Sequence, residues 1–364
     1  MNTKIYGTIG PACCQTEMLV RLFEKGMTGV RINLSHTNLS DAAEWMDHIQ
    51  AAYKLVMQRR QTAGTYPCQP EILMDLRGPE LRIGKLLSDR VLEEGERISL
   101  IPDGRNDLFD PTEIPVPKLL FPHIQAGQEI LLDDGKILLE VEGNFAIQGA
   151  AKERDDTLDE QCNYGLECRV LRGGVLKSSK SIKLQNVVIH PPTLTESDIL
   201  NIKAAKSYGI TGVMLPFVRG KEDLLNLKQA LDAAGAMDIR IFAKIENEEG
   251  IKKLQELLPH CDEIVIARGD LGNAMPLWEL PVAQAKIALK CREKQKPFMV
   301  VTQMLASMEK AAVPTRAEVS DIFRAVNEGA ASVMLTGETA AGKYPVEAME
   351  YLVNTIREAE HYIQ

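Results

Sequence analysis

The sequence lacks the marks of a secreted, disulfide-bonded or membrane-spanning protein. It has seven cysteines among 364 residues, an odd number, and no two of them are spaced C-x-x-C. This usage argues against a disulfide framework and against a zinc site, and it favours a reducing compartment. The amino-terminal residues lack the charged and then apolar layout of a signal peptide. No apolar run approaches the ~18 uninterrupted residues of a membrane-spanning helix, so we expect a soluble, cytoplasmic protein.

Several common ligand-binding signatures are also missing. The chain contains no G-x-x-x-x-G-K-[ST] phosphate loop, no G-x-G-x-x-G and no H-E-x-x-H. Its 42 basic and 51 acidic residues give a net charge of −9. An acidic balance argues against non-specific binding to nucleic acids or to anionic membranes. Hydrophobic residues make up 45% and charged residues 26%, which is ordinary globular usage, and the length predicts two domains or one large barrel with an insertion.

Short apolar runs recur along the chain, and most are followed by a helical pattern. The eight runs cover residues 4–9, 29–34, 72–76, 212–217, 240–245, 263–267, 298–302 and 332–335. They are continuous rather than alternating, as expected of parallel strands buried on both faces. Capping-box spacing at Thr195–Asp198 and Thr315–Glu318 marks two helix starts. Eight strand–helix units predict an α/β fold, a (β/α)8 TIM barrel.

The third strand–helix unit is interrupted by a segment with a different hydrophobic pattern. Runs at 97–101, 129–141 and 165–171 alternate and are separated by DDG, EGN and RGG turns. This pattern predicts an antiparallel, all-β insertion after strand 3. The predicted domains are therefore a catalytic barrel, residues 1–78 and 184–364, and an inserted β-barrel-like lid, residues 79–183.

Polar and charged residues gather at the carboxyl ends of the predicted barrel strands. These residues are Thr8, Arg31, Asn33, Ser35, Asp75, Arg77, Lys244, Glu246, Arg268, Asp270 and Thr302. Burying them without partners would cost several kcal/mol each. They form either an active site or a ring of structural ion pairs, and their position at the catalytic end of the barrel favours the active site.

A divalent metal site is predicted where two neighbouring strands end. Lys244 and Glu246 are two residues apart, so their side chains can face the same side of a strand, and Asp270 ends the next strand. Two carboxylates suit Mg²⁺ or Mn²⁺, with the substrate supplying further ligands. Lys244 then remains to stabilise a developing or transferring anion. A simple Lys–Glu–Asp ion network is the alternative.

A second candidate group lies on the second strand. Arg31, Asn33 and Ser35 alternate and therefore share a face. An arginine suits a phosphate or a carboxylate. The oxygens of Asn33, Ser35 and Asp75 could hold a monovalent cation, although capping of the strand end by Asn33 and Ser35 is an equal alternative.

Taken together, these segments resemble one family, pyruvate kinase, over nearly the whole chain. The matching barrel segments are TKIYGTIGPA at the start, VRINLSH (30–36), MDLRGPELRIG (74–84), AKIENEEG (243–250), IARGDLG (266–272), VTQMLASM (301–308), PTRAEVSD (314–321) and MLTGETAAGKYPVEA (334–348). In the insertion, LLDDGKI (131–137) and SSKSIKL (178–184) resemble parts of the family's mobile lid. The resemblance implies a glycolytic phosphotransferase that moves the phosphoryl group of phosphoenolpyruvate to ADP, giving pyruvate and ATP.

The resemblance also implies a role for each matching residue. Lys244 would stabilise the phosphoryl group in transfer and Arg31 would contact it, while Glu246 and Asp270 would hold Mg²⁺ or Mn²⁺. Gly269, Asp270 and Thr302 would bind the carboxylate, and Thr302 would belong to the route that protonates the enolate carbon. The residues implied for the nucleotide are His36, Arg82, Asp134 and Lys180. Those implied for K⁺ are Asn33, Ser35, Asp75 and the carbonyl of Leu76.

The chain departs from the family pattern in two places. Leu76-Arg77 replaces the usual threonine-lysine; Leu76 is typical of K⁺-independent members and Glu80 of K⁺-dependent ones, so K⁺ dependence stays open. The chain stops at REAEHYIQ, where the family's regulatory domain would begin, so we expect that C-terminal domain to be absent. A homo-oligomer through the barrel is compatible with the resemblance.

Two other functions fit parts of the pattern. One is a metal-dependent aldolase or lyase that acts on pyruvate-type enolates, and the other is a non-catalytic paralogue that binds phosphoenolpyruvate or a nucleotide. Lys244 and the lid favour the phosphotransferase over the aldolase, and the intact set of Lys244, Glu246, Asp270 and Thr302 argues against loss of catalysis. No nucleic-acid or membrane partner is expected.

Overall fold

We describe the protein from a computed structural model, which covers residues 3–35, 37–62, 69–103, 113–133, 135–146, 164–185, 187, 189 and 191–363. By their contacts, the residues divide into two compact units. The first unit is Met1–Gly78 with Thr193–Gln364, and the second is Pro79–Pro192. The alternating hydrophobic pattern of the sequence predicts that the inserted unit ends at residue 183. Each unit is described by itself.

Within the described residues, the first unit contains a closed barrel of eight strands in the order β1-β16-β15-β14-β13-β12-β3-β2. Every neighbouring pair is parallel. The strands are β1 (Lys4–Thr8), β2 (Gly29–Asn33), β3 (Glu71–Asp75), β12 (Gly212–Leu215), β13 (Arg240–Ile245), β14 (Glu263–Ala267), β15 (Phe298–Val301) and β16 (Ser332–Leu335). The predicted (β/α)8 TIM barrel is confirmed.

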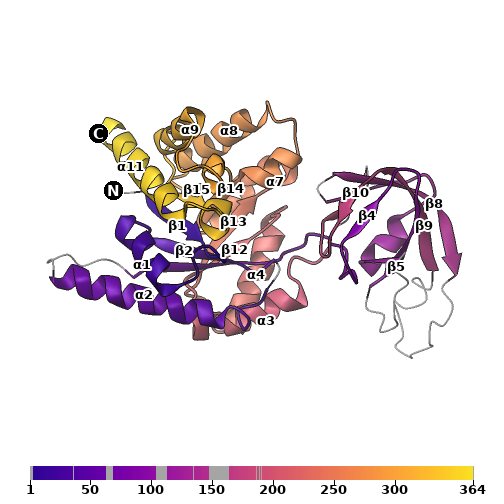
Figure 1. The fold of residues 1–364 in the computed structure, drawn as a ribbon, viewed down its shortest axis with the longest axis horizontal. Coiled ribbons are helices and arrows are strands. Elements are labelled where there is room, and N and C mark those ends of the chain that lie inside the picture. Colours follow the sequence, from indigo (N-terminus) through magenta and orange to yellow (C-terminus); the bar gives the residue numbers. More distant parts are fainter. Residues whose placement is uncertain are drawn as a thin grey trace. The chain divides into compact units, whose positions relative to one another are not determined.

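Helices surround these strands (Figure 1). They are α1 (Thr16–Lys25), α2 (Ala43–Thr62), α3 (Glu196–Ala204), α4 (Lys221–Ala233), α5 (Glu248–Lys252), α6 (Leu254–Leu257), α7 (Arg268–Asn273), α8 (Leu280–Glu293), α9 (Arg316–Asn327), α10 (Gly337–Ala340) and α11 (Pro345–Ile363). Both predicted capping boxes are present, at the starts of α3 and α9. One apolar core lies between strands and helices, and a smaller one, which includes Tyr6, Phe242 and Met299, is made by strand residues. Among the described residues, no helix combines the length and the apolar character that crossing a membrane requires.

The second unit is built from strands, as the alternating runs predicted. A six-stranded sheet has the order β11-β7-β8-β9-β5-β6, and β10 pairs with β4. The strands are β4 (Arg90–Leu92), β5 (Arg97–Pro102), β6 (Glu113–Val116), β7 (Glu129–Leu132), β8 (Ile137–Ala146), β9 (Tyr164–Arg172), β10 (Gly174–Leu176) and β11 (Ile182–Leu184). The expectation of a wholly antiparallel insertion is wrong for one pair, because β5 and β6 run parallel. Alternation of apolar and polar residues occurs in strands of either direction, so it does not predict whether two strands run parallel or antiparallel.

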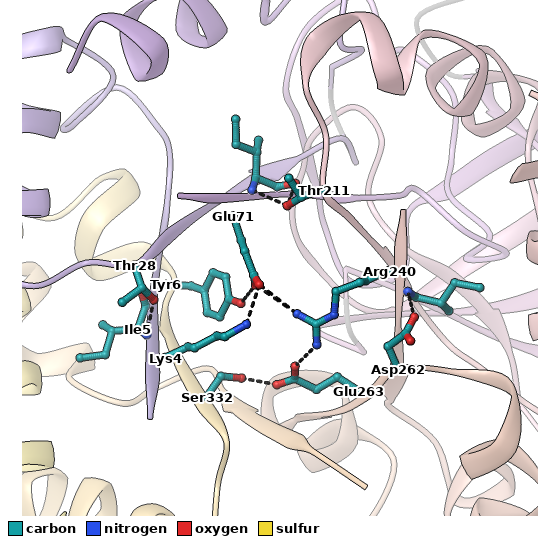
Figure 2. Close-up of polar contacts among 12 residues, drawn as sticks. Lys4, Ile5, Tyr6, Thr28, Glu71, Thr211, Arg240, Asp262, Glu263 and Ser332 are labelled. Carbon is teal, nitrogen blue, oxygen red and sulfur yellow. Dashed lines mark hydrogen bonds and ion pairs between the residues drawn. The ribbon is translucent and has the colours of Figure 1, made fainter. Parts of the chain in front are cut away.

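A network of charged side chains, most of them partly buried, lies at the amino-terminal end of the barrel (Figure 2). Glu71, at the start of β3, accepts hydrogen bonds from Lys4 Nζ at 2.5 Å, from the hydroxyl of Tyr6 and from Arg240 Nη1 at 3.1 and 3.2 Å. Arg240 Nη2 donates to Glu263 at 3.0 Å, and Ser332 donates to the other oxygen of Glu263. This network joins the first residues of several strands at the end of the barrel opposite the predicted site.

Candidate active site

Four charged side chains form a buried chain at the carboxyl end of the barrel. Asp75 ends β3, and its Oδ2 accepts hydrogen bonds from Arg31 Nε at 2.8 Å and Nη2 at 2.6 Å. The same oxygen lies 3.2 Å from Lys244 Nζ, and that ammonium group lies 2.9 Å from Glu246 Oε1. The side chains of Arg31 and Lys244 are each 12% exposed. Two cations therefore share one carboxylate oxygen in a site that excludes most water.

Burial and charge set the protonation states in this chain. Burial acts to raise the pKa of Asp75, but Lys244 and Arg31 outweigh it, so the pKa is lowered and the carboxylate is ionised. Burial acts to lower the pKa of Lys244, but Asp75 and Glu246 outweigh it and raise that pKa, so the lysine is cationic. For Glu246, burial dominates and raises the pKa to about 7, against the pull of Lys244. Asp270 adds to this rise, which indicates that the two carboxylates interact.

Among these four charged side chains, two carboxylate oxygens are buried without a hydrogen-bond partner in the described part of the protein. They are Asp75 Oδ1 and Glu246 Oε1. The second has only its ion pair with Lys244, whereas Oε2 of Glu246 accepts the Phe217 N–H at 2.7 Å. Oxygens of this kind are suitable ligands for hard cations. Within the described residues, no group of three or more His, Cys, Asp and Glu side chains is arranged to hold a metal. Oε1 of Glu246 therefore fits the role of a ligand to a divalent ion, and Asp270 is a second carboxylate whose charge acts on Glu246.

Among the residues predicted to bind a monovalent cation, Asn33 and Ser35 are in direct contact. Asn33 Oδ1 accepts the Ser35 N–H at 3.2 Å, which is the strand-end capping that the sequence left open. Leu76 is buried next to Asp75, and its N–H donates to the carbonyl of Met214. The unpartnered Oδ1 of Asp75 is the oxygen of this group that fits a cation most clearly.

The loops after β14 and β15 meet at Thr302. Arg268, Gly269 and Asp270 begin α7, and a Cβ added to Gly269 would lie 3.0 Å from Thr302 Cγ2. Thr302 has φ of 74° and Gln303 has φ of 56°, which is strained backbone for residues other than glycine. Arg268 donates to the Thr302 carbonyl from Nη2 at 2.7 Å and from Nε at 3.2 Å. The structure therefore brings Gly269 and Thr302 together.

The residues predicted for the nucleotide are divided between the two units. Arg82 and Lys180 lie in the second unit, where Arg82 pairs with Glu80 and donates to the Ser179 carbonyl at 2.9 Å. Lys180 Nζ lies 2.8 Å from Asp133. His36 and Asp134 lie outside the described residues.

Sequence reasoning missed two buried carboxylates that fix the loops around the site. Glu338 accepts the Leu305 N–H at 2.9 Å and the Thr336 N–H at 2.7 Å, so it ties the loop after β15 to the loop after β16. Asp198 accepts the N–H groups of Arg77 at 2.8 Å and Gly78 at 3.1 Å. Two sequence signals could have indicated these residues. They are the T-x-E spacing at 336–338 and the capping-box acid at position 198, but both also fit roles within their own turn or helix.

Comparisons with known proteins agree with this arrangement. A family profile described as "Pyruvate kinase, barrel domain" matches residues 1–349. The pyruvate kinase of Geobacillus stearothermophilus is 38% identical over 352 residues, which cover 96% of this chain and 55% of the relative. That of Sporosarcina psychrophila is 34% identical over 96% of this chain and 55% of its own length. That of Thermococcus litoralis is 35% identical over 99% and 70%. The chain thus spans little more than half the length of the first two relatives.

Proposed function

The chain belongs to the pyruvate kinase family, and on that premise we propose that it transfers the phosphoryl group of phosphoenolpyruvate to ADP, giving pyruvate and ATP. The observation that carries the proposal is the buried charge chain at the carboxyl end of the barrel. There, Arg31 and Lys244 point their cationic groups at one oxygen of Asp75. Phosphoryl transfer relies on positioning and on electrostatic stabilisation more than on covalent work by the protein.

Arg31 and Lys244 bind and stabilise the phosphoryl group in this proposal. Both cations have little exposure to water, so their attraction for an anionic group is stronger than at the surface. Asp75 Oδ2 contacts both cationic groups and orients them when no substrate is bound. Because the pKa of Lys244 is raised, the side chain stays positively charged at neutral pH and does not act as a base.

Glu246 and Asp270 would hold the divalent cation. A bound Mg²⁺ or Mn²⁺ would polarise the enolate oxygen and the phosphoryl oxygens. Glu246 has to lose its proton to serve as a ligand, and its pKa of about 7 lies within reach of neutral pH. Asp75 Oδ1 is the proposed centre of a K⁺ site with Asn33, Ser35 and the Leu76 carbonyl.

The substrate carboxylate is proposed to lie against Gly269 and Thr302. Gly269 has no side chain, which leaves its backbone accessible beside the Thr302 methyl group. The hydroxyl of Thr302 is then placed to belong to the proton route to the enolate carbon. His36, Arg82, Asp134 and Lys180 are proposed to bind the nucleotide phosphates, with the second unit acting as a lid. A cytoplasmic, glycolytic role and a homo-oligomer through the barrel follow from the family as further proposals.

The first test is pyruvate release from phosphoenolpyruvate and ADP with Mg²⁺ or Mn²⁺, with and without K⁺. We expect turnover that requires the nucleotide and falls by orders of magnitude in Lys244→Met while divalent metal still binds. Lys252→Met is the matched control, because this lysine lies on α5, pairs with Glu248 and is 73% exposed. Full turnover in Lys244→Met would contradict the role of the lysine. Metal-dependent binding of phosphoenolpyruvate without any turnover would favour a non-catalytic paralogue.

A further inference from the structure

The backbone at Thr302 adopts a conformation that threonine rarely occupies. Its φ of 74° makes it the one β-branched residue with positive φ in the described part of the chain, and Gln303 follows with φ of 56°. A side chain branched at Cβ clashes with the backbone there, so the conformation persists only where surrounding groups hold it. The strain lies at a residue that we propose lines the carboxylate subsite.

A single guanidinium group holds this backbone in place. Arg268 Nη2 and Nε donate to the Thr302 carbonyl at 2.7 and 3.2 Å, and Nη2 also lies 3.1 Å from Met304 Sδ. The remaining nitrogen, Nη1, pairs with Asp321 on α9. The side chain of Arg268 is 10% exposed, so these contacts are made in a largely dry environment. The planar fork of arginine can serve a carbonyl and a carboxylate at once, which a lysine ammonium cannot do in the same geometry.

We infer that Arg268, oriented by Asp321, is a positioning residue that sets the Thr302 hydroxyl for the reaction. Arg268 directly precedes Gly269 and Asp270, so one residue fixes both the start of α7 and the loop after β15. The inference deepens the proposed function and rests on it for its kinetic test. A purely structural brace would make the same contacts, and the two roles differ in whether the effect of Arg268 depends on the Thr302 hydroxyl.

The test is a double-mutant cycle between Arg268→Lys and Thr302→Ala, read as kcat for pyruvate formation. Arg268→Lys alone is expected to lower kcat by up to about 100-fold, the size of loss that misplacing a reacting group by an ångström can cause. In the Thr302→Ala background the same change is expected to alter kcat by less than about two-fold, because no hydroxyl remains to be placed. Asp321→Asn should act in the same direction with a smaller loss, and it carries the cycle if Arg268→Lys does not fold.

The matched control is Arg324→Lys on α9. Arg324 pairs with Glu328 at 2.7 Å and donates to the Pro281 carbonyl at 3.2 Å, so it has the same kinds of partner away from the site. We expect its kcat to equal that of the unchanged chain. Additive losses in the cycle would overturn the inference while leaving the proposed function intact.

If the unchanged chain releases no pyruvate, the proposed function fails and the inference is decided structurally. The readout is then the Thr302 backbone in crystals of Asp321→Asn and Arg268→Lys. A φ that leaves the left-handed region in the variants supports the positioning role. A φ that stays near its present value in both variants refutes it.

Discussion

Removing Arg240 should destabilise the barrel by about 3 kcal/mol, because breaking a buried ion pair by deleting one partner costs about 3–5 kcal/mol and this side chain is partly exposed. Arg240 Nη1 donates to both oxygens of Glu71, and Nη2 donates to Glu263 at 3.0 Å. Its exposed fraction of 31% places the expected loss at the lower end of that range. The guanidinium also lies 4.8 Å from the centre of the Phe242 ring, a contact that methionine replaces only in part. We therefore choose Arg240→Met.

Most of the loss should come from Glu263. Glu71 keeps its hydrogen bonds from Lys4 and Tyr6, whereas Glu263 keeps only that from Ser332 among the donors described. Burial raises the pKa of Glu263 in the unchanged protein, and losing Arg240 raises it further. A carboxyl group whose folded-state pKa lies above its unfolded value of about 4.3 costs stability as pH rises through that interval. The destabilisation should therefore be largest at alkaline pH and shrink toward acid, where Glu263 takes up a proton.

Urea unfolding followed by tryptophan fluorescence measures this loss in the barrel alone. Trp45 and Trp278 are the only tryptophans, and both lie in the first unit. The expected result is a lower midpoint with an unchanged slope. Lys4→Met is the matched control: its ion pair with Glu71 is 45% exposed on the lysine side, and exposed pairs contribute about 0–1 kcal/mol. An Arg240→Met loss no larger than the Lys4→Met loss, or one independent of pH, would refute the reasoning.

Three further outcomes are expected. Calorimetric titration should show an affinity for Mn²⁺ that rises with pH through about 7, because Glu246 loses its proton there. The Glu246→Gln variant should bind Mn²⁺ more weakly and without that pH dependence. An unchanged Mn²⁺ affinity in the variant would contradict the role of Glu246 as a ligand. Gly78→Ala should unfold at lower urea than Gly235→Ala, because both have positive φ but only the first would place a Cβ 2.3 Å from Pro216; equal midpoints would show that the contact relaxes at no cost. Asp198→Ala should lower the free energy of unfolding by about 2–4 kcal/mol, since it leaves the buried N–H of Gly78 and the partly buried N–H groups of Arg77 and Thr195 without their acceptor. A loss below about 1 kcal/mol would mean that water replaces the carboxylate.

The network of Figure 2 illustrates what the sequence alone could not provide. Residue patterns predict a functional site at the carboxyl ends of the strands, and they give no such signal for the charged residues at the strand starts. Glu71, Arg240 and Glu263 each stand at the first position of a strand. A charged first residue also fits a solvated strand end, and only the closed barrel turns these positions toward one another.

The barrel, its strands and two helix starts could be predicted from the sequence alone. These depend on local patterns: continuous apolar runs specify strands buried on both faces, and a capping box satisfies the first N–H groups of its own helix. The same patterns placed Lys244, Glu246 and Thr302 at strand ends, because residue order along a strand fixes which residue comes last.

Which of these groups contact one another, and which of them are ionised, depends on the tertiary structure. Asp75 meets Arg31 from 44 residues away and Lys244 from 169 residues away, on one oxygen. Barrel closure brings those strands together, and burial then sets the pKa of Glu246 near 7. Such pairings depend on distance in space and on the loss of water, neither of which is written in the spacing of residues along a chain.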